Sequence, residues 1–195
     1  MNILNRILAT KQTEIEANIR TRVFEDVFEE AKSIRRSVLS FSESLKNSDN
    51  HIIAEFKRRS PSKGFFNAGA DAETIVGGYS AAGAAAISVL TDRDYFGGSL
   101  NDLVIARKVS AVPLLRKDFI IDPYQICEAR IAGADVILLI AAAMTPHKCG
   151  ELAEFARSLN LEVLLEIHNE QELNCLNTFV NVVGVNNRDL TTFVT

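Results

Sequence analysis

Six short apolar runs alternate with amphipathic segments over most of this 195-residue chain, and this alternation limits the fold more than any other feature. The runs are almost continuous in Val, Ile, Leu and Ala, which is typical of parallel strands covered by helices, in a barrel or an open sheet. The predicted strands are HIIAEFK (51–57), AAAISVLTD (84–92), VPLLRKDF (112–119), ADVILLIAA (134–142), LEVLLEIHN (161–169) and VNVVGVNNRDL (180–190).

Helices are predicted between these runs and in an arm that precedes them. Residues 3–47 repeat apolar side chains at helical spacing, and we expect no strand there. Ala-Gly-Ala turns at 82–84 and 132–134 indicate helix ends that lead directly into the next strand. The other predicted helices cover 72–82, 100–110, 124–132, 146–159 and 170–178.

We therefore predict an α/β fold of the (β/α)8 TIM-barrel type. No Gly-x-Gly-x-x-Gly motif follows the first run, whereas polar residues end nearly every run, as the mouth of such a barrel requires. An eight-stranded barrel takes about 250 residues. We expect an incomplete barrel with about six of the eight units over 49–195, after a helical extension over 1–48 and with a C-terminal truncation at Thr195. Its open edges would then favour self-association.

Composition excludes several classes of protein. A net charge of −4 argues against a surface for nucleic acid or anionic membrane. The three cysteines are widely spaced and predict neither disulfides nor a zinc site. We found no signal peptide and no apolar run of membrane-spanning length, so we expect a cytoplasmic protein.

Charged and amide side chains gather at the predicted strand ends. Glu55 and Lys57 lie two residues apart and so share one face of a strand. The Ser60-Pro61-Ser62 segment after them has loop chemistry. Lys117, Glu166, Asn186 and Arg188 end three later runs. Because the carboxyl ends of barrel strands meet at one mouth, we expect all these groups to converge there.

The blocks AEFKRRSPSKG, VLTDRDYFGGS, LLRKDFIID, GADVILLI, LLEIHN and VGVNNRDL together resemble the indole-3-glycerol phosphate synthase family of tryptophan biosynthesis. LNRILATKQTEI also resembles the family's extra helix over the barrel mouth. The resemblance implies a carbon-carbon lyase (a carboxy-lyase, or decarboxylase) that needs no metal or other cofactor. Its substrate would be 1-(2-carboxyphenylamino)-1-deoxyribulose 5-phosphate, closed to indole-3-glycerol phosphate with loss of carbon dioxide and water.

The same resemblance implies roles for individual residues. Lys117 would be the general acid of ring closure and Glu166 the general base of dehydration. Lys57 would neutralise the substrate anion, and Glu55 would bind its hydroxyls and orient the lysines. The implied substrate-binding residues are Ser60, Phe96, Phe119, Leu138, Asn186 and Arg188. The family's phosphate loops follow strands seven and eight, outside this chain, so the resemblance alone does not predict turnover by these 195 residues.

Other interpretations stay open at this point. Glu55 with Lys57 could form an ordinary ion pair, and Lys117-Asp118 could be a solvated strand end. The alternative functions are another phosphosugar barrel, such as phosphoribosylanthranilate isomerase, and a non-catalytic fragment that associates with itself. Glu166 and His168 lack a third metal ligand at matched spacing. Phe65 and Phe66 are predicted to pack in the core or against a helix, rather than to contact substrate, and Cys127 to fill the core.

Overall fold

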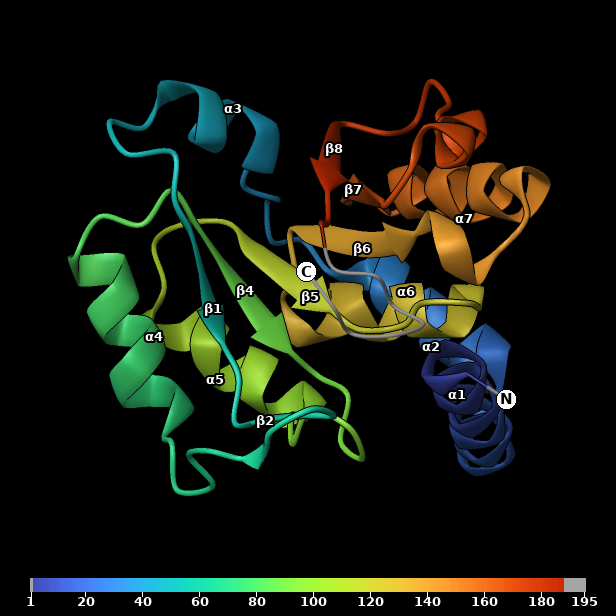
Figure 1. Ribbon diagram of the computed structural model, residues 1–195, viewed down its shortest axis with the longest axis horizontal. Helices are drawn as coiled ribbons and strands as arrows, with labels where there is room; N and C mark the ends of the chain where they lie inside the picture. Colours follow the sequence, from blue (N-terminus) through green and yellow to red (C-terminus); the bar gives the residue numbers. More distant parts are fainter. Residues whose placement is uncertain (1, 188–195) are drawn as a thin grey trace.

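The structure is a computed structural model and describes residues 2–187, in which six parallel strands form one curled sheet in chain order, β1-β4-β5-β6-β7-β8 (Figure 1). This half-barrel confirms the predicted incomplete (β/α)8 architecture. Each strand lies within a predicted run: β1 Ile53–Phe56, β4 Ala86–Leu90, β5 Leu114–Lys117, β6 Val136–Ile140, β7 Glu162–Ile167 and β8 Val182–Val185.

Four α-helices cover the outer face of the sheet (Figure 1): α4 Ala72–Ala81, α5 Leu100–Val109, α6 Pro123–Ala132 and α7 Pro146–Ser158. Each is preceded by an N-cap residue whose side chain accepts a backbone N–H of the first turn; these residues are Asp71, Ser99, Asp122 and Thr145. The C-cap of helix α6 is Gly133, which has a left-handed φ of 95°. The two 3-10 helices are η1 Ala141–Ala143 and η2 Glu170–Cys175.

The predicted helix at 170–178 is wrong in type and length, because η2 ends at Cys175. Asn177 causes the early end. Its side chain donates to the Cys175 carbonyl at 3.1 Å and accepts the Phe179 N–H at 3.0 Å. An asparagine that bonds to its neighbouring backbone in this way competes with the helix.

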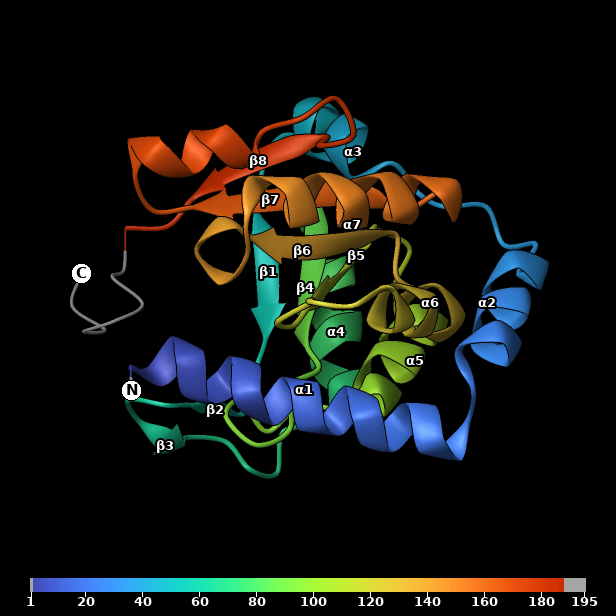
Figure 2. The same ribbon diagram turned by 90° about the vertical axis from the view of Figure 1, so that its right-hand side faces the viewer.

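The N-terminal arm contains helices α1 Ile3–Thr21, α2 Phe24–Ser33 and α3 Phe41–Asn47, and no strand among its described residues. Figure 2 shows α1 crossing beyond the carboxyl ends of β1 and β4, while α3 lies near the opposite ends of these strands. Lys11 of α1 also contacts Asp92 and Asp118, just after β4 and β5. The Ser44 hydroxyl of α3 donates to the Ala85 carbonyl, just before β4 begins. The predicted position of the first helix over the mouth is therefore confirmed.

No helix within residues 2–187 combines the length and the apolar character needed to cross a bilayer.

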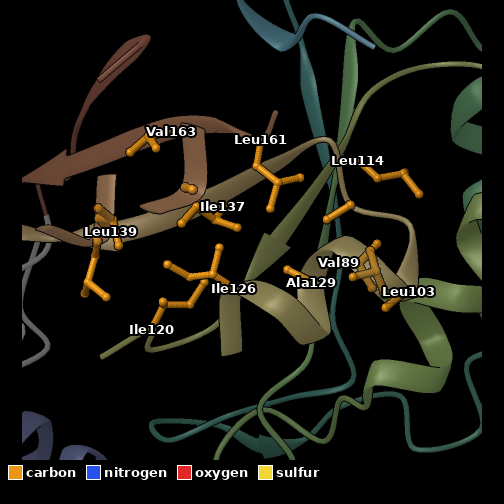
Figure 3. Packing of buried hydrophobic residues seen from close by; sticks show 14 of the residues in the cluster. Val89, Leu103, Leu114, Ile120, Ile126, Ala129, Ile137, Leu139, Leu161 and Val163 are labelled. Carbon is orange, nitrogen blue, oxygen red and sulfur yellow. The ribbon is translucent and has the colours of Figure 1, made fainter. Parts of the chain in front are cut away.

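Buried side chains from alternate strand positions form two clusters. Ile87, Leu114 and Ile137 belong to the outer cluster, on the side of the helices. Figure 3 shows part of this cluster, including Leu114 and Ile137. Their neighbours Ala86, Leu115 and Leu138 face the inside of the curl. Both faces of the central strands are thus buried, which explains why their sequences are almost continuously apolar. The strands at the two edges differ, since Ile53 of β1 and Val183 and Val185 of β8 are exposed.

The segment after β1 folds into a small antiparallel hairpin of β2 Arg59–Ser60 and β3 Gly64–Phe65. Gly64 turns it with a left-handed φ of 64°. The prediction that Phe65 and Phe66 pack in the core or against a helix is wrong, because they are 57% and 52% exposed. The hairpin leaves both rings largely exposed, and the Arg59 guanidinium lies over the Phe65 ring, 5.2 Å from its centroid.

Candidate active site

One pocket at the mouth contains every predicted site residue that the structure describes. It opens at the carboxyl ends of the strands, beside the hairpin after β1. Arg188 lies outside the described residues, so its position is not given. The nine predicted residues that line the pocket are Glu55, Lys57, Ser60, Phe96, Lys117, Phe119, Leu138, Glu166 and Asn186.

Strand register brings the ionisable groups together. Leu90 of β4 pairs with Lys117 of β5, and Ile140 of β6 pairs with Glu166 of β7. Lys117 has the same parity as Leu115, and Glu166 the same as Leu164, and both leucines belong to the inner cluster. Each charged group therefore stands above an inward-facing apolar side chain, as the alternation predicts.

Charges of opposite sign alternate across the pocket. Glu55 forms a close ion pair with Lys57, and its other oxygen lies 4.0 Å from Lys117 Nζ. Lys117 Nζ is 3.6 Å from Glu166 Oε2, and the Asn186 amide donates to Glu166 Oε1 at 3.1 Å. Lys117 thus lies between two carboxylates. The pocket can both deliver and accept a proton.

The rest of the pocket is apolar. The rings of Phe96 and Phe119 lie 6.1 Å apart at an interplanar angle of 37°, and Leu138 is buried beside them in the inner cluster. Phe119 itself is buried. Such a surface suits a flat aromatic group, whose faces pack well against tilted rings. The pocket therefore pairs an apolar wall with a charged rim.

A buried ion-pair cluster around Lys11, which holds α1 against the carboxyl ends of β4 and β5, was not predicted from the sequence. Lys11 of α1 is 3% exposed, and its Nζ lies 2.7 Å from Glu14 Oε2 and 3.0 Å from both Asp92 Oδ2 and Asp118 Oδ1. Asp118 is buried, so the interpretation of Lys117-Asp118 as a solvated strand end is wrong for Asp118. No local pattern pointed to this contact, because the aspartates lie about 80 and 110 positions from Lys11 in the chain.

The two aspartates also hold the pocket's aromatic residues. Asp92 Oδ1 accepts the backbone N–H groups of Tyr95 and Phe96, at 2.8 and 3.2 Å. Asp118 Oδ1 accepts the Phe119 N–H at 2.9 Å. Lys11 is therefore linked to both rings of the apolar wall through one carboxylate each.

Protonation of this group follows from its charges. Burial alone would raise the pKa of the Asp118 carboxyl, but the positive charges of Arg116 and Lys11 outweigh it and lower that pKa. Burial alone would lower the pKa of Lys11, but Asp118, Asp92 and Glu14 outweigh it and raise that pKa. Both groups are charged at neutral pH.

The His168 ring lies between Glu166 and Glu172. Its Nε2 is 3.6 Å from Glu166 Oε1, and its Nδ1 is 3.2 Å from Glu172 Oε2. No group of three or more His, Cys, Asp or Glu side chains within residues 2–187 is placed to hold a metal ion.

Cys127, Cys149 and Cys175 are buried, and none of them forms a disulfide. Cys127 packs in the outer core, as predicted.

Comparison with known proteins decides the family. The family model for indole-3-glycerol phosphate synthase matches residues 4–195. The chain belongs to the indole-3-glycerol phosphate synthase family. It is 50% identical over 194 residues to the indole-3-glycerol phosphate synthase of Bacteroides thetaiotaomicron, a match that covers 100% of this chain and 74% of that protein. The enzyme of the same name from Desulfosudis oleivorans is 44% identical over 199 residues, covering 100% of this chain and 75% of the relative.

These matches confirm the predicted family and enzyme class, a carboxy-lyase of tryptophan biosynthesis. The family assignment also favours the synthase over the isomerase named as an alternative. The chain spans about three quarters of the length of these curated relatives.

Proposed function

We propose that the pocket around Lys117 converts 1-(2-carboxyphenylamino)-1-deoxyribulose 5-phosphate to indole-3-glycerol phosphate. The observation that carries the proposal is the position of Lys117 Nζ, 3.6 Å from Glu166 and 4.0 Å from Glu55, beside the Phe96–Phe119 wall. An acid, a base and an apolar surface for an aromatic ring are the groups that this reaction needs.

Lys117 acts first, as the general acid. It gives a proton to the ketone oxygen of the ribulose chain while the aromatic carbon that bears the carboxylate attacks the ketone carbon. The carbon–carbon bond to the carboxylate then breaks, carbon dioxide leaves, and its electron pair returns to the ring. Glu55 and Glu166 flank the ammonium group of Lys117 and hold it in line for this transfer.

Glu166 acts second, as the general base of dehydration. It removes a proton from the closed ring system while the carbon–oxygen bond to the hydroxyl formed from the ketone breaks. Solvent in the pocket gives this hydroxyl a proton, and it leaves as water. The Asn186 amide fixes Glu166 Oε1 at 3.1 Å, which leaves the carboxylate in one orientation beside Lys117. Acid and base thus lie on neighbouring sides of one pocket, and each takes one step.

The remaining residues bind the substrate. Phe96, Phe119 and Leu138 hold the aromatic ring, and Lys57 neutralises the substrate's negative charge. Glu55 contacts its hydroxyl groups and orients both lysines through the ion pairs already described. Ser60 and Asn186, which line the same pocket, and Arg188 bind the polar ribulose and carboxylate groups.

Two variants separate the two steps. Carbon dioxide release from carboxylate-labelled substrate reports closure, and indole fluorescence reports dehydration. We expect Glu166→Gln to release carbon dioxide while indole formation falls by about 100-fold or more, and Lys117→Ala to lose both signals. The matched control is Lys108→Ala, an exposed lysine on α5. Equal loss of both signals in Glu166→Gln would contradict the division of roles.

Self-association through the sheet edges is a separate proposal. Two observations support it: β1 and β8 are the edge strands of the sheet within residues 2–187, and both carry exposed β-branched side chains. Light scattering that finds only monomers at all concentrations would overturn it. A cytoplasmic location is likewise proposed, because three buried free thiols suit a reducing compartment.

A further inference from the structure

A buried ring nitrogen of His168 lies next to Glu166, the proposed base, and makes no hydrogen bond within the described residues. His168 Nε2 is fully buried and has no hydrogen-bond partner among the described residues. The nearest polar atom recorded for it is Glu166 Oε1, at 3.6 Å. A buried polar atom left unpaired costs free energy, so its persistence beside a reacting group calls for an explanation.

The surroundings of Glu172 define which ring nitrogen carries the proton. Glu172 Oε2 accepts the backbone N–H of His168 at 2.8 Å, and Glu172 Oε1 accepts the Asn169 amide at 2.8 Å. A carboxylate held by these donors accepts hydrogen bonds and donates none. His168 Nδ1, 3.2 Å from Glu172 Oε2, must therefore be the protonated nitrogen.

In this tautomer the lone pair of Nε2 faces Glu166. Two acceptors facing each other do not bond, which explains the 3.6 Å separation and the missing hydrogen bond. The situation changes once Glu166 has taken a proton from the substrate. Its carboxyl group then has an O–H that can donate to Nε2, and distances of this kind shorten in the working complex.

We propose that His168, oriented by Glu172, accepts from Glu166 the proton that Glu166 removes from the substrate, and so returns Glu166 to its basic form. The O–H bond on Glu166 breaks and an N–H bond forms on His168 Nε2. The imidazolium lies between the carboxylates of Glu166 and Glu172, and it gives the proton to water after the product leaves. This inference rests on the role proposed for Glu166.

His168 acts through Glu166 and does not touch the substrate, so it is a positioning residue. The charged groups recorded around the relay are Glu166 of β7, Glu172 of η2 and, on the far oxygen of Glu166, Lys117 of β5. The Asn186 amide donates a hydrogen bond to Glu166 Oε1, but it does not ionise in this pH range.

The first test needs no turnover. The chain has three histidines, and His168→Asn assigns the signals of His168 in a long-range 1H–15N spectrum of the unaltered protein at pH 8. We expect a neutral ring with the proton on Nδ1. A ring protonated on Nε2, or on both nitrogens, would overturn the relay whether or not the proposed reaction is correct.

The second test measures proton return. In His168→Ala we expect the first turnover to keep its rate within about threefold while steady-state turnover falls by about tenfold or more. Added imidazole should restore the steady state, which a merely structural loss would not allow. His147→Ala is the control, because His147 is 85% exposed and pairs only with Glu151 among the ion pairs recorded for it. Equal loss in both kinetic phases without rescue would overturn the relay, and an unaffected Glu166→Gln would overturn the proposed base instead.

Discussion

Replacing Lys11 with methionine should destabilise the protein strongly, because it removes the cation that two buried carboxylates share. Asp92 is 0% exposed and Asp118 is 3% exposed, and each lies 3.0 Å from Lys11 Nζ. Removing one partner of a buried ion pair costs about 3–5 kcal/mol. We take the lower end, about 3 kcal/mol, because Asp118 keeps Arg116 and Asp92 keeps two backbone donors.

Urea unfolding followed by circular dichroism measures this cost. With an m value of about 2 kcal/mol/M, a loss of about 3 kcal/mol lowers the midpoint by about 1.5 M at unchanged m. The control is Lys32→Met, where a half-exposed lysine pairs with Glu29 at 3.0 Å, and we expect a change below about 0.5 kcal/mol.

A second variant tests the reason for the loss. Lys11→Met with Asp92→Asn should be more stable than Lys11→Met alone, because it no longer buries an unpaired carboxylate. A Lys11→Met protein within about 0.5 kcal/mol of the unaltered one would refute the reasoning. So would a double variant that is less stable than the single one.

Three further predictions follow from single sites. The pKa of Asp118 is lowered in the folded protein, so Asp118 stabilises the fold fully above about pH 4 and loses this contribution as pH falls through the folded pKa. Asp118→Asn should therefore flatten the acid side of a plot of stability against pH, with stability measured as the urea midpoint. Gly98→Ala should destabilise the protein by several kcal/mol in the same assay, because the added Cβ would lie 2.0 Å from the Leu90 carbonyl oxygen. The control is Gly78→Ala in α4. Its added Cβ would meet no atom within 4 Å, and it should stabilise the protein by about 0.5–1 kcal/mol. Burial raises the pKa of Cys127 to about 12, so we expect no reaction of this thiol with a disulfide reagent at pH 8 until urea unfolds the chain; rapid labelling of the folded protein would contradict its burial.

The barrel and its mouth were predictable because their signals are local and repeated. Leu114, Leu115 and their counterparts in other strands are buried on opposite faces, which produces the continuous apolar runs from which the sheet was inferred. Lys117 and Glu166 end such runs, and the parallel arrangement of strands then brings them together without further information. These elements agree between local pattern and global fold.

The parts that escaped prediction depend on distant contacts. Lys11 looks like any surface lysine of an amphipathic helix, and only the crossing of α1 over β4 and β5 buries it against Asp92 and Asp118. Phe65 has a core-type side chain, but the hairpin turns it outward. Hydrophobicity alone could not reveal this, because exposed apolar residues are common on folded proteins.

Product formation by the Lys117→Ala variant, beside the unaltered chain and Lys108→Ala, tests the central claim most directly. Indole-3-glycerol phosphate is followed by its fluorescence under saturating substrate. The account predicts formation by the unaltered chain and the control, and a loss of about 100-fold or more in Lys117→Ala. Formation by Lys117→Ala at a rate within a few-fold of the control would contradict the assignment of this pocket as the site of ring closure.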